Sequence, residues 1–329
     1  MKYYMLLALV AGCHAFFQPG APPPPEQFDD PGSLFADDEV EEYEPVTTTS
    51  PAIQEISQKC GIRKDHPLFR AATLNNTKAR YAEFNWVVPI FEVMWNGVEN
   101  YTCVGSLIHP RVVLSVAHYF VTKRNWLIRA GDWNIDENNE FFKHQSIYVA
   151  TVEKHPKFNA KLRFDAALLF LVSPVTPNQH VGFACLPHSN SVTLPGSACI
   201  VTGWGVDSFK DGHISDIMKM SKVPAVSDAD CQETLRARMG QAFNLHKSWM
   251  CAGGRTGEDA CLKDGGAPLV CPYTNSATAN QYYQAGIVSW GYNCGLDGVP
   301  GVYTKVAEVR QWIDDQMVAN GYDTMSYTA

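Results

Sequence analysis

Short apolar segments recur from residue 60 onward, each bounded by clusters of glycine, asparagine or proline. Some alternate apolar with polar positions and others are apolar throughout, as in strands with one or both faces buried. The clearest are residues 87–93, 111–116, 146–152, 166–172, 198–202 and 284–290. Only residues 228–239 and 306–317 have a helical pattern, with a capping residue or a glutamate near the start. This spacing predicts an all-β barrel or sandwich.

The first fifteen residues have the pattern of a secretory signal peptide. Lys2 supplies a positive start, residues 5–11 are apolar, and residues 13–15 form a cleavage site. No later segment reaches the roughly eighteen uninterrupted apolar residues that a membrane-spanning helix needs. We therefore expect a secreted, extracellular protein with no membrane insertion.

Residues 16–59 differ from the rest of the chain in composition. They hold ten acidic residues, one lysine, eight prolines and no cysteine, within a 329-residue chain of net charge −8. The remainder is therefore nearly neutral, and no basic surface for nucleic acid is expected. Such a segment buries too little apolar surface to fold and is predicted to be disordered. It is either a solvated spacer or a partner-binding arm in which Tyr43, flanked by glutamates, is sulfated.

Several motifs occur in order along residues 71–317. They are Gly105 to Pro110, Val112 to His118, Asp165 to Leu169, Cys199 to Gly205, Ser289 to Gly291 and Pro300 to Val306. Together they resemble the chymotrypsin-fold serine proteases. The resemblance implies a double six-stranded β-barrel with a C-terminal helix over 71–317, a tethered segment at 60–70, and a C-terminal tail at 318–329.

Only two of the three positions of a catalytic triad carry the residue that catalysis needs. In active relatives a serine attacks the substrate carbonyl, histidine takes its proton, and aspartate orients the histidine. His118 and Asp165 match the last two, whereas Gly265 stands where the serine belongs. Lys263, before Asp264, replaces the glycine whose N–H would face the oxyanion. We expect no catalytic residue and no proteolysis, with His118 and Asp165 kept as a buried pair that holds the barrels together.

Three residues match the pocket that gives trypsin-like members their preference for arginine and lysine. Asp259 corresponds to the pocket floor, and Gly291 and Gly301 correspond to its walls. Either the pocket is an unused remnant, or its carboxylate still captures a basic loop of a partner through charge-assisted hydrogen bonds.

Ten cysteines fit a disulfide-bonded protein of an oxidising compartment, with Cys13 lost in the signal peptide. The resemblance implies the pairs Cys60–Cys185, Cys199–Cys271, Cys231–Cys251 and Cys261–Cys294. Cys103 is left unpaired, because its usual partner follows the catalytic histidine, where this chain has Tyr119. Cys103 is expected to be a buried thiol, or else to form an intermolecular disulfide.

Cleavage between Arg70 and Ala71 would match the activation site of relatives. Asp264 is present to receive a new amino terminus, but the usual Ile-Val-Gly-Gly is missing, and cleavage is left open. Asn75 and Asn100 each begin a glycosylation sequon.

The acidic run at 132–140 overlaps a loop that binds calcium in some relatives. We expect a solvated loop here, with calcium binding as the alternative. No other metal and no cofactor is expected.

In its details the chain resembles the non-catalytic serine protease homologues of arthropods, including relatives of prophenoloxidase-activating factor. The tether Cys60, residues 106–110 and 129–133, and the glycine at the nucleophile position are the shared features. Such relatives are cofactors in extracellular immune cascades, which implies a secreted protease or zymogen as partner. They usually carry a six-cysteine clip domain, whereas residues 16–59 contain no cysteine. A secreted binding module for microbial surfaces or matrix, and residual hydrolase activity, remain as alternatives.

Overall fold

The computed structural model describes residues 59–64, 77–137, 140–189, 191–206, 212–255, 260, 262–273 and 280–329. Several sequence predictions concern residues outside these ranges and stay predictions. They are the signal peptide at 1–15, residues 16–58 with Tyr43, the Arg70–Ala71 bond, the Asn75 sequon, Asp259 and Cys261.

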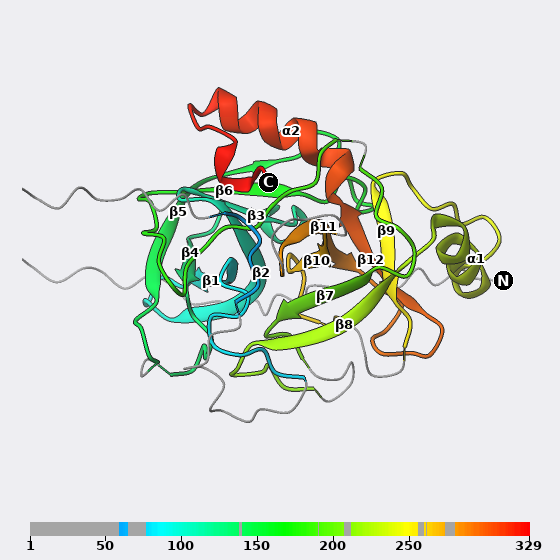
Figure 1. The fold of residues 1–329 in the computed structure, drawn as a ribbon, viewed down its shortest axis with the longest axis horizontal. Coiled ribbons are helices and arrows are strands. Elements are labelled where there is room, and N and C mark those ends of the chain that lie inside the picture. The colour runs from blue at the N-terminus through cyan, green and yellow to red at the C-terminus, as the bar shows by residue number, and fades with distance from the viewer. Residues whose placement is uncertain are drawn as a thin grey trace, which may run out of the picture. The chain divides into compact units, whose positions relative to one another are not determined.

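The first barrel is built from antiparallel strands (Figure 1). They are β1 (Val87–Val93), β2 (Glu99–His109), β3 (Val112–Ser115), β4 (Trp126–Ala130), β5 (Gln145–Lys154) and β6 (Ala167–Leu171). They close in the order β1-β2-β3-β6-β5-β4. Every residue of β3 and β6 is buried, which explains why these two segments are continuous apolar runs.

The second barrel repeats this architecture. Its strands are β7 (Ala198–Gly203), β8 (Lys219–Val226), β9 (Trp249–Gly253), β10 (Pro268–Pro272), β11 (Tyr282–Trp290) and β12 (Pro300–Lys305), closed in the order β10-β11-β12-β9-β8-β7. The described strands thus form two closed six-stranded barrels, as the resemblance implied.

Apolar side chains from both barrels share one core. Val87 and Val104 of the first barrel belong to the same buried cluster as Val201 and Val270 of the second. The backbone N–H of Val104 also donates to the carbonyl oxygen of Gly265 at 3.0 Å. The residues that match the triad therefore lie where the two barrels meet.

Local capping sets the bounds of the helix α1 (Asp228–Met239), which lies at the edge of the second barrel (Figure 1). The Oγ of Ser227 accepts a hydrogen bond from the N–H of Asp230 at 3.1 Å. Gly240 follows the last helical residue with a positive φ of 102°, a conformation that glycine adopts without strain.

The C-terminal residues pack into the first barrel. Helix α2 (Val306–Ala319) is followed by a 3₁₀ turn at Met325–Tyr327. Tyr327 is fully buried beside residues of β3 and β6. Its hydroxyl donates to Asp314 at 2.7 Å, and the hydroxyl of Ser326 donates to the carbonyl of Ile108 at 2.7 Å. The predicted tail at 318–329 is therefore anchored to the core through Tyr327, while most of its other residues are exposed.

Three of the implied disulfides are present: Cys60–Cys185, Cys199–Cys271 and Cys231–Cys251. Cys294 is also disulfide-bonded, with its other half outside the described residues. Of the cysteines that the structure describes, Cys103 alone is free, and it is buried. Within the same part of the chain, no helix has the length and apolar character needed to cross a membrane.

Replacing Tyr327 by alanine is expected to lower the free energy of unfolding by about 3–5 kcal/mol, because it removes a large side chain from a filled core. Denaturant unfolding measures the change. Met325→Ala is the matched control two residues away, since Met325 is 76% exposed, and it should shift stability by less than about 0.5 kcal/mol. Equal effects of the two variants would contradict the packed C-terminus.

Candidate functional site

His118 and Asp165 lie side by side at the junction of the barrels. His118 begins the 3₁₀ turn His118–Phe120 that follows β3, and Asp165 stands shortly before β6. The Nδ1 atom of His118 is 2.7 Å from Oδ2 of Asp165. Because a carboxylate only accepts hydrogen bonds, Nδ1 carries a proton and donates a hydrogen bond to Asp165, which leaves Nε2 on the other side of the ring. The structure therefore brings together the first two positions of the triad.

The carboxylate of Asp165 is fully buried and accepts hydrogen bonds from both barrels. Its Oδ1 accepts from the N–H groups of Ala117 at 2.8 Å and His118 at 3.0 Å. Its Oδ2 accepts from the hydroxyl of Ser289, in β11, at 2.7 Å, in addition to His118. The hydroxyl of Thr304, in β12, donates to the Asp165 carbonyl at 2.9 Å. A buried anion with this many donors is well compensated.

Gly265 occupies the third position and contributes backbone only. Its carbonyl accepts from Val104, and the next residue, Gly266, donates to the carbonyl of Val288 at 2.9 Å. The imidazole of His118 can hold or pass a proton. Among residues 262–270, however, no side chain carries a hydroxyl or thiol that could form a covalent intermediate.

Lys263 keeps a left-handed backbone, with φ at 72°. A side chain in this region costs about 1–2 kcal/mol relative to glycine. The hydroxyl of Tyr101 donates to the Lys263 carbonyl at 2.9 Å, and the buried Asp264 accepts from the N–H of Gly205 at 2.7 Å. Burial raises the pKa of Tyr101 well above its usual value, so the phenol stays protonated and donates. Sequence reasoning missed Tyr101, because no local pattern shows which carbonyl its hydroxyl reaches.

Tyr119 also belongs to the site, although the sequence had marked it only as the residue in place of a cysteine. Its ring lies against the imidazole of His118, with centroids 4.4 Å apart. Burial raises the pKa of the Tyr119 hydroxyl, which is therefore neutral.

The pocket residues are only partly described. Gly291 follows β11 on the exposed surface, and Gly301 lies buried within β12, paired with Ala252 of β9. Because Asp259 lies outside the described residues, the trypsin-like pocket stays a prediction.

The Asn100 sequon is accessible, although it does not lie in a loop. Asn100 is the second residue of β2 and is exposed, and the hydroxyl of Thr102 donates to its carbonyl at 3.0 Å. Glycosylation at Asn100 stays a prediction.

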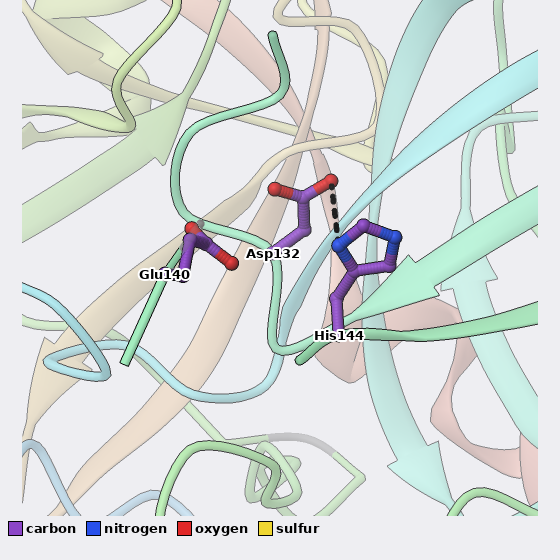
Figure 2. Close-up of side chains that lie close together, drawn as sticks. All are labelled: Asp132, Glu140 and His144. Carbon is purple, nitrogen blue, oxygen red and sulfur yellow. Dashed lines mark ion pairs between the residues drawn. The ribbon is translucent and has the colours of Figure 1, made fainter. Parts of the chain in front are cut away.

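The acidic run at 132–140 is not a fully solvated loop, which corrects the sequence expectation. Asp132 is only 2% exposed, and Glu140 is half-buried. Figure 2 shows both carboxylates near the imidazole of His144, and one ligand atom from each lies within 4.8 Å of the others. Backbone donors hold Glu140, whose Oε1 accepts from the N–H groups of Trp133 and Asn134, both at 2.8 Å. Asp132 accepts from the guanidinium of Arg129 at 3.4 Å.

Two carboxylate oxygens of this cluster remain without a hydrogen-bond donor among the described residues, Oδ1 of Asp132 and Oε2 of Glu140. Burial raises the pKa of Asp132 to about 6, against the opposing charge of Arg129, and burial raises that of Glu140 to about 7. Unpaired carboxylate oxygens suit a hard cation such as calcium. Calcium binding at this loop stays a prediction.

Asp165→Ala is expected to lower the free energy of unfolding by about 3 kcal/mol or more, because several buried donors lose their acceptor at once. His118→Ala is the comparison, since it leaves the carboxylate with its remaining donors, and should cost about 1–2 kcal/mol. Urea unfolding of the two variants tests this order. A larger loss for His118→Ala would show that the carboxylate does not hold the barrels together.

The contribution of Asp132 and Glu140 to stability should fall as the pH rises from about 4 to 7, whereas His155, whose pKa is lowered to about 4 by burial, contributes in the opposite direction. The native protein keeps protons on Asp132 and Glu140 that the unfolded chain has already lost in this range. Asp132→Asn should remove one part of this contribution, so the melting temperature of the variant minus that of the wild-type chain should rise as the pH rises from about 4 to 7. Glu137→Gln removes a charge from an exposed position of the same loop and should leave the slope of melting temperature against pH unchanged.

A rise in melting temperature with Ca²⁺ that Asp132→Asn abolishes would support calcium binding.

Comparison with known proteins agrees with this geometry. Residues 74–313 match the family model described as trypsin. The chain is 39% identical over 297 residues to phenoloxidase-activating factor 2 of Galleria mellonella, covering 87% of this chain and 97% of that protein. It is 36% identical to inactive CLIP domain-containing serine protease A8 of Anopheles gambiae, and the alignment covers 83% of this chain and 74% of that protein. It is 35% identical to trypsin of Sus scrofa, and the alignment covers 66% of this chain and 86% of that protein. The chain therefore belongs to the trypsin family.

Proposed function

We propose that this chain is a secreted, non-catalytic member of the trypsin family that binds a protease or zymogen and regulates it in an extracellular, melanisation-type immune cascade. The observation that carries the proposal is the glycine at position 265 beside a complete His118–Asp165 pair. The general base is in place, but it has no nucleophile to activate.

The energetic effect of this absence is large. Removal of a triad nucleophile lowers turnover by about a million-fold, and the remaining acceleration depends on binding and on the oxyanion hole. Here Lys263 replaces the glycine of that hole and adopts a left-handed backbone. Turnover is therefore too slow to be the function, and binding is what the barrels can still supply.

The relatives support a regulatory role. One of them is named a phenoloxidase-activating factor and another an inactive serine protease, and the alignment with the first spans nearly the whole of both chains. The disulfides support secretion, because structural disulfides persist in oxidising compartments.

The test is a reconstitution with purified components. The chain is added to a prophenoloxidase zymogen and its activating protease, and the rate of phenoloxidase appearance is measured. A several-fold change in rate is expected, with no turnover of a tripeptide arginine substrate by the chain alone. The control is Sus scrofa trypsin blocked at its serine by a phosphonylating reagent, which shares the family without the proposed role.

Two results would overturn the proposal. Substrate turnover that stays with the chain through purification would show that it is an enzyme. An unchanged rate, together with tight binding to a microbial surface, would favour a binding module outside proteolysis.

A further inference from the structure

The ring of Tyr119 lies where the side chain of a residue at position 265 would begin. A Cβ atom built on Gly265 would lie 2.6 Å from Cε2 of Tyr119, 3.3 Å from its hydroxyl oxygen and 3.4 Å from Cζ. Carbon atoms in contact are about 3.5–4.0 Å apart, so the first distance is a steric overlap. A serine hydroxyl would extend one bond further from the backbone than this Cβ.

Tyr119 has little room to withdraw. Its ring is partly exposed, but it rests on His118 and packs against two buried apolar clusters. Moving the ring out of this position would break these packing contacts, which is costly.

The loop of Gly265 is also fixed from its other side. A Cβ on Gly266 would lie 2.1 Å from the carbonyl oxygen of Val104 and 2.3 Å from Oγ of Ser115, so this backbone already touches β2. The hydrogen bonds of Gly265 with Val104 and of Gly266 with Val288 hold it there. The loop cannot move back to make room for a side chain at 265.

The tyrosine at position 119 also determines that Cys103 has no disulfide partner there. Cys103 is free and fully buried, and it belongs to a buried apolar cluster against which Tyr119 packs. Burial raises the pKa of the Cys103 thiol, so it stays neutral. A single residue at position 119 therefore leaves a cysteine without a partner and fills the space beside Gly265.

We propose that Tyr119 is a plug in the former nucleophile site, which makes glycine at position 265 a packing requirement and closes the cleft to a substrate-like chain. A carbonyl about to react must lie about 3–3.5 Å from the nucleophile atom, and the ring already overlaps the position from which the nucleophile side chain would extend. The partner therefore docks without threading a peptide across the His118–Asp165 pair. The inference goes beyond the regulatory role and holds whichever partner is bound.

A double-mutant cycle tests the packing requirement. Gly265→Ser should lower the melting temperature by roughly 3–10 °C, because overpacking a filled site costs about 1–3 kcal/mol. In the Tyr119→Ala background the same change should shift it by about 1 °C or less. Tyr119→Phe is the matched control: it keeps the ring carbon nearest to position 265 and should retain the full penalty.

Tyr119→Cys provides a second background without the ring, in case Tyr119→Ala folds poorly. The cost of Gly265→Ser should disappear there as well, and mass spectrometry reports whether Cys103 has formed a disulfide. An equal cost in all backgrounds would overturn the packing requirement.

Closure of the cleft is tested by binding of pancreatic trypsin inhibitor, whose rigid loop enters trypsin-like clefts as a substrate would. Tyr119→Ala should bind it at least tenfold more tightly than the wild-type chain and Tyr119→Phe do. If Tyr119 only fills the core and does not close the cleft, Tyr119→Ala will bind the inhibitor as weakly as the wild-type chain does. That result would contradict the proposed plug.

Discussion

The junction of the two barrels depends on the hydrogen bonds that the buried carboxylate of Asp165 accepts. A buried anion is tolerated only when donors surround it, and here they come from the turn after β3 and from β11. Rotation of one barrel against the other would remove at least one donor from this charge. The pair of His118 and Asp165 therefore has a structural role that is independent of catalysis, which explains how it fits a chain with glycine at the nucleophile position.

The loop from Lys263 to Gly266 keeps a defined course although two of its side chains differ from those of active relatives. Its backbone is held by Tyr101, Val104 and Val288, all of which contribute through hydrogen bonds. These bonds offset the strain of a left-handed lysine. The loop is thus held in place, with Asp264, Gly265 and Gly266 buried, although no catalytic side chain remains at position 265.

Much of this architecture was predictable from the sequence. The bounds of β1 and α1 agree with the predicted residues 87–93 and 228–239, because apolar runs and a serine cap are local signals. The predicted segments did not include six further strands, β2, β4, β8, β9, β10 and β12. Of these, β10 and β12 are short and begin with proline, which is unusual in a strand. The motifs identified His118 and Asp165, but they could not show that Asp132 is buried or that Tyr119 faces Gly265. Both facts depend on contacts between residues far apart in the chain.

The free thiol of Cys103 sits within β2 with no exposed surface. Oxidants, alkylating reagents and thiols of other proteins can reach it only in molecules whose first barrel has opened. Its reactivity therefore follows how often that barrel opens and not the redox potential outside, so a covalent dimer formed through this sulfur would be a sign of damaged material.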